Sequence, residues 1–305
     1  MFTYLIFTTT ISSGETSSTI EQMQVDGEKD KEKQRSDVIK VFKVVIKTIV
    51  GSHSICLQPF RNSYIQLLPH LLRLYPASKH HSVTSNDDEL DTDVSICVSC
   101  LAQAHLDDDQ IELVVSKLEE ISFSQSWHMR HCCLPYIQVF LFVNLFTVRR
   151  MEGVVQRVRR LVSRLLRDEQ FEVADMAKTT FSGMIQCELV TIDEELTKEI
   201  GELLGKGKLK KTSKNDKIQK RHAGILMLSA CLLSSPYNVP DWMPDVVMRL
   251  SRFLHDPPPI QQSVKNTFQQ FKRTHNDSWQ QDKHKFTSEQ LTVLTDMLVS
   301  PNYYA

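Results

Sequence analysis

The sequence predicts an all-α fold, an α-solenoid of paired antiparallel helices like those of HEAT and armadillo repeats. Apolar residues recur at helical spacing over most of the chain. In the last third, helices alternate with connectors that contain Pro and Asp, and the helix pairs repeat at roughly 40 residues. No alternating strand pattern of useful length interrupts them. At ordinary helix lengths we expect about ten to twelve helices.

The composition supports a folded chain. Hydrophobic residues make up 41% of the 305 residues and charged residues 24%. The net charge of -1 argues against a globally basic nucleic-acid binder, so we expect no direct sequence-specific binding to nucleic acid. The odd count of 7 Cys, without a regular framework, is typical of free thiols in a reducing compartment.

The N-terminal part is predicted to begin with a disordered lead-in at residues 1–37, rich in Ser, Thr and charge. Its first residues lack a basic region, and their apolar run is short, so no secretory signal is expected. Helical repeats are expected over residues 38–205. The first helix has an apolar stripe formed by Val38, Val41, Phe42, Val45 and Ile49.

The next helix should cover residues 57–74 and stop near Tyr75–Pro76, with Pro59 and Pro69 weakening its continuity. Residues 78–93 are predicted to form a loop that supplies capping residues, and helix follows helix from Val94 onward. The stretch at 107–121 opens with three acids, which favour a helix N-terminus.

The most apolar stretch, residues 134–148, is too short to span a bilayer and contains Gln138 and Asn144, so we predict a buried core helix and no membrane partner. Amphipathic helices follow at 154–170 and 168–187. A basic loop at 206–217 separates them from the C-terminal repeats, residues 218–305, where helices are expected at 221–235, 243–255, 260–275 and 287–300, with a short polar loop before the last.

Nothing in the sequence indicates an enzyme. His128, His131, Cys132 and Cys133 crowd into about one helical turn, whereas zinc needs two separated ligand pairs, so a structural role is favoured and no metal site is predicted. Phosphate-binding and nucleophile-elbow motifs are absent from the sequence. The acidic pairs Asp107–Asp108 and Glu194–Glu195 suit helix capping better than acid–base chemistry. We therefore predict no catalytic residue.

Two basic surfaces leave alternatives open. The segment from 206 to 221 is either a solvated loop, a nuclear localisation signal or a patch for an anionic ligand. Its basic residues are Lys206, Lys208, Lys210, Lys211, Lys214, Lys217, Lys220 and Arg221. The arginine face of the helix at 154–170 is either solvated or binds a polyanion such as an inositol phosphate, because guanidinium forks suit phosphate oxygens. It comprises Arg157, Arg159, Arg160, Arg164 and Arg167.

The chain ends in Tyr303, Tyr304 and Ala305, a hydrophobic residue, a tyrosine and one further residue at a free C-terminus. Pro301 keeps the last helix from continuing, so a short extended tail is expected. Such a tail can present an aromatic body, a phenol and a carboxylate to a pocket of a partner protein.

Residues 221–279 and 286–305 closely resemble the C-terminus of the proteasome activator complex subunit 4 family, and the resemblance extends back to about Val38. The family comprises long HEAT-repeat activators of the 20S proteasome that act without ATP in the nucleus and cytoplasm, in protein degradation and DNA repair. By this resemblance the tail would insert between α-subunits of the 20S α-ring and favour gate opening. Tyr303 would supply the hydrophobic position, Tyr304 the bonded hydroxyl and Ala305 the carboxylate.

The resemblance also implies a bromodomain-like region at about residues 107–200 that recognises acetylated histones. Where relatives have Asn and an aromatic residue, this chain has Glu188 and Leu189, and an ionised Glu cannot donate a hydrogen bond to an acetyl oxygen. The resemblance further implies that inositol phosphates bind in basic channels. The alternatives to a proteasome activator are a chromatin-associated module and a generic HEAT scaffold.

Overall fold

The computed structural model describes residues 40, 43, 44, 47, 62–75, 88–207, 209 and 215–298. The chain divides into two compact units, Met1–Ser52 and His53–Ala305. In the first unit only Lys40, Lys43, Val44 and Lys47 are described, and all four are helical. The predicted lead-in and the apolar stripe that begins at Val38 lie outside the described residues.

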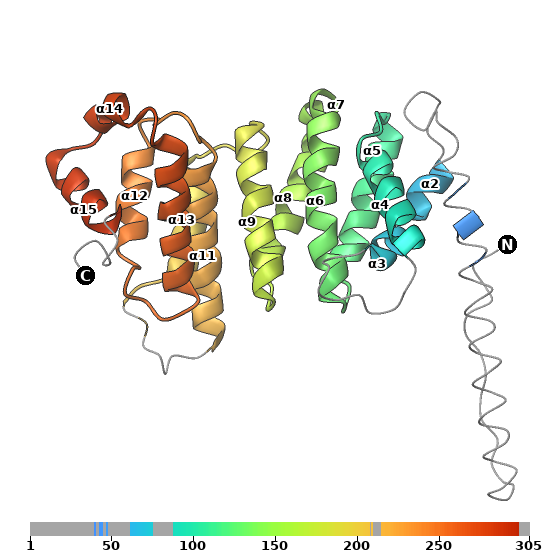
Figure 1. Cartoon of the computed structure of the whole chain (residues 1–305), viewed down its shortest axis with the longest axis horizontal. Coiled ribbons are helices and arrows are strands. Elements are labelled where there is room, and N and C mark those ends of the chain that lie inside the picture. Colours follow the sequence, from blue (N-terminus) through green and yellow to red (C-terminus); the bar gives the residue numbers. More distant parts are fainter. Residues whose placement is uncertain are drawn as a thin grey trace, which may run out of the picture. The chain divides into compact units, whose positions relative to one another are not determined.

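The second unit is all-α in its described residues, which contain fourteen α-helices, one 3-10 helix and no strand (Figure 1). This confirms the predicted fold class. The helices are α2 Asn62–Gln66, α3 Leu68–Leu74, α4 Asp88–Ala102, α5 Asp108–Ser122, α6 Trp127–Val143, α7 Leu145–Arg150, α8 Glu152–Leu165, α9 Phe171–Gln186, α10 Glu194–Leu204, α11 Asn215–Leu233, α12 Met243–Ser251, α13 Ile260–His275, α14 Trp279–Asp282, η1 Lys283–Lys285 and α15 Ser288–Leu298.

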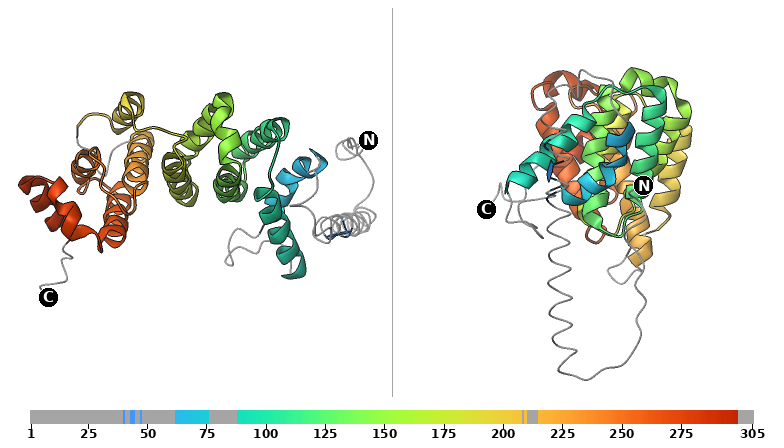
Figure 2. Two further views of the ribbon diagram at one scale, coloured as in Figure 1. Left: turned by 90° about the horizontal axis from the view of Figure 1, so that it is seen from above. Right: turned by 90° about the vertical axis from the view of Figure 1, so that its right-hand side faces the viewer.

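The helices of this unit pair up and stack. Helix α5 packs on α6, α8 on α9 and α10 on α11, while α6, α9, α11 and α13 contact one another in succession. Viewed along the helix axes, neighbouring helices lie side by side (Figure 2). The second helices of the pairs thus form one layer, and α5 and α8 contact each other in the other layer. This arrangement is that of an α-solenoid.

The predicted repeat length appears in the hydrogen bonds between successive pairs. Gln138 of α6 donates to Thr180 of α9, 42 residues later, and His222 of α11 bonds Ser263 of α13 across 41 residues. Arg130 of α6 donates to Asp168 after α8, 38 residues on. Side chains therefore join equivalent positions of neighbouring repeats, which confirms the period of about 40 residues.

The buried core is formed by the apolar faces of the amphipathic helices. Helix α8 buries all six of its apolar residues, which recur at helical spacing: Val154, Val155, Val158, Leu161, Val162 and Leu165. Helix α11 differs, because every residue from Arg221 to Leu232 is buried and the helix contacts α9, α10, α12 and α13. A Cβ atom at Gly224 would lie 3.0 Å from the Leu203 Cβ atom, so the glycine permits the close approach of α10 and α11.

Helix α4 begins earlier than the sequence suggested. The predicted loop at 78–93 is wrong from Asp88, where α4 starts. Leu90, Val94 and Cys97 fall on one face of this helix and are buried, and this tertiary contact outweighs the acidic, loop-like local sequence. Acidic side chains in the first turn also suit the positive end of the helix dipole.

Several predicted helices are shorter or divided. The predicted helix at 57–74 is described from Asn62, breaks at Leu67 and ends at Leu74, next to Tyr75 as predicted. The predicted core helix at 134–148 breaks at Asn144 into α6 and α7. These breaks explain why the helices outnumber the ten to twelve expected. No helix in the described ranges meets the length and hydropathy that crossing a membrane requires.

The C-terminal repeats differ from prediction in two places. Helix α11 begins at Asn215, inside the predicted basic loop. The predicted polar loop before the last helix contains α14 and η1, because Trp279 packs edge-on against Phe271 and close to Phe286, with ring centroids 6.5 Å and 5.7 Å apart. Burial of these aromatic rings stabilises a segment whose sequence is otherwise polar.

Candidate functional site

Helix α15 carries the end of the chain. It contacts α12 and α13 and buries Leu294 completely. Its start is set by a capping box in which Thr287 Oγ1 accepts from the Gln290 backbone N–H at 3.2 Å and Gln290 Oε1 accepts from the Thr287 backbone N–H at 2.9 Å. The description ends at Leu298, so Tyr303, Tyr304 and Ala305 lie outside the described residues.

The segment before α15 is tied to the preceding repeat. Lys285 Nζ donates to the Val239 carbonyl at 2.8 Å and to Asn238 Oδ1 at 3.2 Å. His275 Nε2 bonds the Asn238 carbonyl at 3.2 Å. These bonds join η1 and α13 to the connector between α11 and α12. The segment that leads into α15 is therefore bonded to residues of the preceding repeat.

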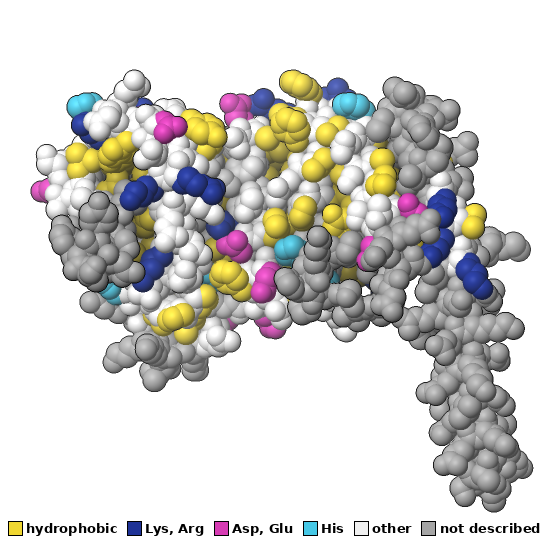
Figure 3. Space-filling view, viewed as in Figure 1, with side chains coloured by type: hydrophobic (Ala, Val, Ile, Leu, Met, Phe, Trp, Pro, Cys, Tyr) yellow, Lys and Arg dark blue, Asp and Glu magenta, His cyan; other side chains and the backbone are white. Residues whose placement is uncertain are grey.

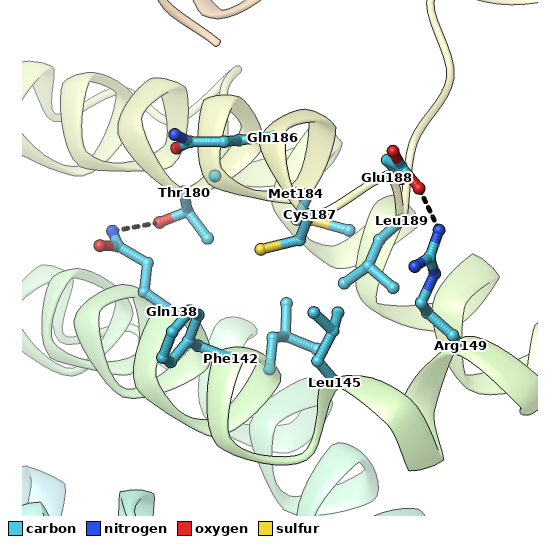
Figure 4. A pocket seen from close by; sticks show the side chains of 12 residues that line it. Gln138, Phe142, Leu145, Arg149, Thr180, Met184, Gln186, Cys187, Glu188 and Leu189 are labelled. Atoms are coloured by element: carbon cyan, nitrogen blue, oxygen red, sulfur yellow. Dashed lines mark hydrogen bonds and ion pairs between the residues drawn. The ribbon is translucent and has the colours of Figure 1, made fainter. Parts of the chain in front are cut away.

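A second candidate site is a pocket of about 540 Å³ between α6 and α9 (Figure 4). Apolar side chains make most of its wall, and polar groups mark its ends. Gln138 Nε2 donates to Thr180 Oγ1 at 2.9 Å at one end, and Arg149 pairs with Glu188 at the other. The lining residues are Gln138, Leu141, Phe142, Leu145, Arg149, Thr180, Gly183, Met184, Gln186, Cys187, Glu188 and Leu189.

Glu188 and Leu189, predicted from the resemblance, both line this pocket. Glu188 has a φ of 57°, the left-handed conformation that ends many helices and that Asn and Gly tolerate better than Glu. The Leu189 backbone N–H donates to the Met184 carbonyl at 2.9 Å and closes the end of α9. The Glu188 side chain is 73% exposed and pairs with Arg149, so its carboxylate lies at the rim, whereas Leu189 is buried in the wall.

The sequence did not point to the other lining residues. Phe142 is 72% exposed beside the pocket, and Phe146 of α7 is 87% exposed. Figure 3 shows apolar side chains at the surface around the place where α7 lies in Figure 1. In the sequence, Phe142 and Phe146 lie within one long apolar run. Nothing in that run indicates which of its side chains face solvent. Only the break at Asn144 and the packing on α9 separate the buried from the exposed members.

The residues of the basic segment at 206–221 have different environments in the structure. Lys206 is exposed, and Lys217 and Lys220 lie in the first turns of α11. Lys208, Lys210, Lys211 and Lys214 fall outside the described residues. Arg221 is only 4% exposed and bonds Asp256 Oδ2 at 3.0 Å, so in the folded chain its guanidinium is not available to a localisation receptor or an anionic ligand.

The histidine and cysteine cluster at the start of α6 is built into the packing. Cys132 and Cys133 are buried, and burial raises the pKa of the Cys132 thiol to about 11 and that of the Cys133 thiol further. Burial lowers the pKa of His131, and His128 adds to this effect. Within the described residues no group of three or more His, Cys, Asp or Glu side chains is arranged to hold a metal ion.

The arginine face of α8 is largely engaged. Arg157 pairs with Glu112 and Glu119 of α5, and Arg159 pairs with Glu195 and Glu199 of α10. These two arginines join neighbouring repeats, so they are not merely solvated. Arg160, Arg164 and Arg167 line a separate pocket of about 370 Å³.

Comparison with known proteins accounts for most of the chain. Residues 218–305 match the family model described as proteasome activator complex subunit 4-like, C-terminal. Proteasome activator complex subunit 4A of Danio rerio is 43% identical over 94% of this chain, and subunit 4 of Homo sapiens is 42% identical over 92%. Proteasome activator BLM10 of Saccharomyces cerevisiae is 28% identical over 56% of this chain.

The matched part is short relative to these proteins. The alignment covers 16% of the Danio rerio relative, 15% of the human one and 8% of the Saccharomyces cerevisiae one. The chain thus spans about one sixth of the length of the two vertebrate relatives. With the helical solenoid, the family model and the vertebrate matches taken together, the chain belongs to the proteasome activator complex subunit 4 family.

Proposed function

We propose that this chain is a non-enzymatic activator or adaptor of the 20S proteasome that docks its C-terminal residues between α-subunits of the α-ring. The observation that carries this proposal is the family match of residues 218–305, the part of the chain that ends in Tyr303, Tyr304 and Ala305. The curated relatives are named proteasome activators. Action in the nucleus and cytoplasm, in protein degradation and DNA repair, belongs to the same proposal.

The mechanism rests on three groups of the tail. The Tyr303 ring buries apolar surface, the Tyr304 hydroxyl bonds in the pocket, and the Ala305 carboxylate forms a charge-assisted bond to a basic side chain of the α-ring. Helix α15, which contacts α12 and α13, precedes these residues in the sequence. If the tail binds the open ring more tightly than the closed ring, its binding shifts the population toward the open gate without ATP.

We expect binding of the 305-residue chain to purified 20S core particle to depend on the terminal carboxylate. Adding one Gly after Ala305 retains every side chain but displaces the carboxylate, and should weaken binding about 10- to 100-fold, the equivalent of one charged hydrogen bond. Tyr304→Phe should weaken it about 5- to 10-fold. The affinity of each variant for immobilised 20S core particle is measured, and the rate of peptide hydrolysis by the core particle reports gate opening.

Asn302→Ala serves as the matched control, because it alters the neighbouring residue and leaves all three docking groups in place. A synthetic peptide with residues 299–305 should compete with the intact chain. Undiminished binding of the Gly-extended chain, or equal losses in the control, would show that the tail does not dock. A chain that does not bind the core at all would favour the generic scaffold.

A second candidate function is recognition of acetylated histones, supported by the pocket between α6 and α9 and its apolar wall. An acetylated lysine has a four-carbon apolar stem and a neutral amide, which suit such a wall flanked by Gln138 and Thr180. The Glu188 carboxylate, which pairs with Arg149 at the rim, can only accept hydrogen bonds, so it supplies no donor to the acetyl oxygen. The proposal therefore predicts weak reading by this chain.

Glu188→Asn is expected to raise affinity for an acetylated histone-tail peptide about 5- to 10-fold, because Asn adds an amide donor and tolerates the left-handed backbone. Fluorescence polarisation of acetylated and unmodified peptides measures the preference. Glu194→Asn, on the exposed first turn of α10, is the control for the change in charge. Equal affinity for the two peptides in the parent and in both variants would exclude acetyl-lysine reading.

A further inference from the structure

A further pocket, of about 340 Å³, lies at the N-terminal ends of α9 and α11, beside the residue that precedes α13. The polar side chains of its lining belong to Asp168, Glu169, Asn215, Gln219 and His222, and Phe171 supplies an aromatic ring. None of the described residues that line it is Lys or Arg, in contrast to the arginine-lined pocket beside α8. Carboxylates in a concave site attract a cationic group.

One of the two carboxylates is already engaged. Asp168 accepts from Arg130 Nε at 2.6 Å and from Arg130 Nη2 at 2.9 Å, and its Oδ1 also accepts from the Gln170 backbone N–H at 3.0 Å. Glu169 is exposed and has no ion pair among the described residues. Of the two carboxylates in the lining, that of Glu169 is therefore the one available to a ligand.

The wall of the pocket also contains a buried nitrogen without a partner. His222 is only 6% exposed, and its Nε2 bonds Ser263 Oγ at 2.8 Å, whereas Nδ1 makes no hydrogen bond among the described residues. Burial lowers the pKa of His222 to about 4, so the imidazole is neutral at physiological pH. When Nε2 carries the hydrogen and donates to Ser263, Nδ1 is an acceptor. Buried polar atoms are nearly always bonded, so this nitrogen marks a place where a ligand can bond.

The groups that remain open in this pocket are acceptors. Gln219 Nε2 donates to the Arg167 carbonyl at 2.8 Å, which leaves the Gln219 Oε1 atom without a partner in the described part of the chain. Together with the Glu169 carboxylate and His222 Nδ1, it favours a ligand that has several donors and no acceptor. A guanidinium group has five N–H donors and no acceptor, whereas an ammonium group has three donors and no flat face.

The aromatic ring beside these acceptors suits a flat cation. Phe171 is 41% exposed, and its ring lies within 16° of parallel to the His222 ring, with centroids 6.0 Å apart. A guanidinium stacks on the face of an aromatic ring and at the same time directs its N–H groups outward in its own plane. Phe171 can therefore support the same group that the acceptors bind.

We propose that the pocket of Glu169, Phe171 and His222 binds an arginine side chain of a partner peptide. The guanidinium stacks on Phe171, pairs with Glu169 at the rim and donates to Gln219 Oε1 and His222 Nδ1. The volume of the pocket falls in the range of small-molecule sites. This site is separate from the pocket between α6 and α9 and does not depend on docking of the C-terminal tail.

The probe is the pentapeptide Gly-Gly-Arg-Gly-Gly with blocked ends, titrated into the full chain by isothermal titration calorimetry. Two matched peptides carry lysine or citrulline in place of arginine. Citrulline keeps the planar shape but is neutral and has an acceptor oxygen. The arginine peptide should bind at least about 3-fold more tightly than the lysine peptide and at least about 10-fold more tightly than the citrulline peptide. A fourth peptide carries glutamate, to test for an anion at the helix N-termini.

The double variant Glu169→Gln/Phe171→Leu is expected to weaken binding of the arginine peptide at least about 10-fold, because the ion pair and the stacking contact are both lost. The control is Glu172→Gln/Tyr237→Leu, which removes one exposed carboxylate and one exposed aromatic ring outside the pocket. It should change affinity less than about 2-fold, through the general field alone. Circular dichroism of both variants verifies that they remain folded.

Nitrogen NMR of the histidine side chains shows whether the peptide reaches the pocket. The resonance of His222 Nδ1 should shift when the arginine peptide binds, and that of the exposed His255 should not. Such a shift, with a loss confined to the pocket variant, supports the proposal. Equal affinity for the arginine and citrulline peptides overturns it, as do tighter binding of the glutamate peptide, equal losses in both variants, an unshifted Nδ1 resonance, and absence of binding at millimolar concentration.

Discussion

Arg221→Met is expected to lower the free energy of unfolding by about 3–5 kcal/mol, the usual cost of leaving one partner of a buried ion pair alone. The guanidinium joins three segments of the chain. It donates to the Leu204 carbonyl at the end of α10 at 2.7 Å, to the Gly207 carbonyl at 2.8 Å and to Asp256 Oδ2 at 3.0 Å. Met matches much of the apolar stem and removes all three bonds.

The double variant Arg221→Met/Asp256→Leu should recover at least half of the loss, because no unpaired carboxylate then remains in the core. The control Arg150→Met breaks an ion pair with Asp108 in which both side chains are more than half exposed, and it should cost less than about 0.5 kcal/mol.

Urea unfolding measures the free energies of these variants, and amide hydrogen exchange in residues 194–207 locates the effect. A loss below about 1 kcal/mol for Arg221→Met would show that Asp256 is not left unpaired in the core.

Asn144→Leu is expected to lower the free energy of unfolding by about 2–4 kcal/mol. The Asn144 side chain is buried between α6 and α7, where Oδ1 accepts from the Leu106 backbone N–H at 2.9 Å and Nδ2 donates to the Ala104 carbonyl at 3.0 Å. Leu has a similar size but leaves both backbone groups of the α4–α5 connector unsatisfied, at about 1–3 kcal/mol each.

Asn144→Asp separates the acceptor role from the donor role. The carboxylate still accepts from Leu106 but faces two carbonyls, those of Ala104 and Phe140, so ionisation is unfavourable and the folded-state pKa should be raised. The variant should then be less stable at neutral pH and regain part of its stability as pH falls, because the protonated acid can donate.

Exposed Asn276→Leu is the control for the Asn144 variants and should stay within about 0.5 kcal/mol of the parent. Thermal unfolding at pH 5 and pH 7.5 measures the effect for each variant. Stability of Asn144→Asp that is independent of pH would contradict the assigned bonds, as would a loss for Asn144→Leu no larger than for the control.

Much of the fold was predictable from the sequence because helix formation is governed by near neighbours. The apolar residues from Val154 to Leu165 recur at helical spacing, so the sequence predicted α8 before any packing was known, although the helix predicted at 154–170 ends at Leu165 in the structure. The period of about 40 residues and the family resemblance were also readable in the sequence. The sequence-based prediction was wrong where contacts between residues far apart in the chain determined the structure. An example is Leu90, which is buried in the first turn of α4, within the segment predicted to be a loop.

For the candidate sites, the difference between what the sequence predicts and what only the tertiary structure reveals is larger. The tail residues Tyr303, Tyr304 and Ala305 form a contiguous motif, and sequence alone can propose them. The sequence could not tell that Arg157 and Arg159 are paired while Arg160 is open, since their partners lie about 40 residues away in either direction. Nor could it tell that Arg221 is buried, because a basic segment resembles a solvated loop until Asp256 is brought beside it.

The sequence by itself determined the helices, their repeat and the family, because these depend on periodic local patterns and on long continuous similarity. The tertiary structure decided which polar side chains are bonded and which are open to a ligand, and it alone formed the pockets at Glu188 and at Arg164. The physical reason is that a charged or polar group takes its role from the partners that surround it after packing, and in a stacked array those partners belong to the next repeat.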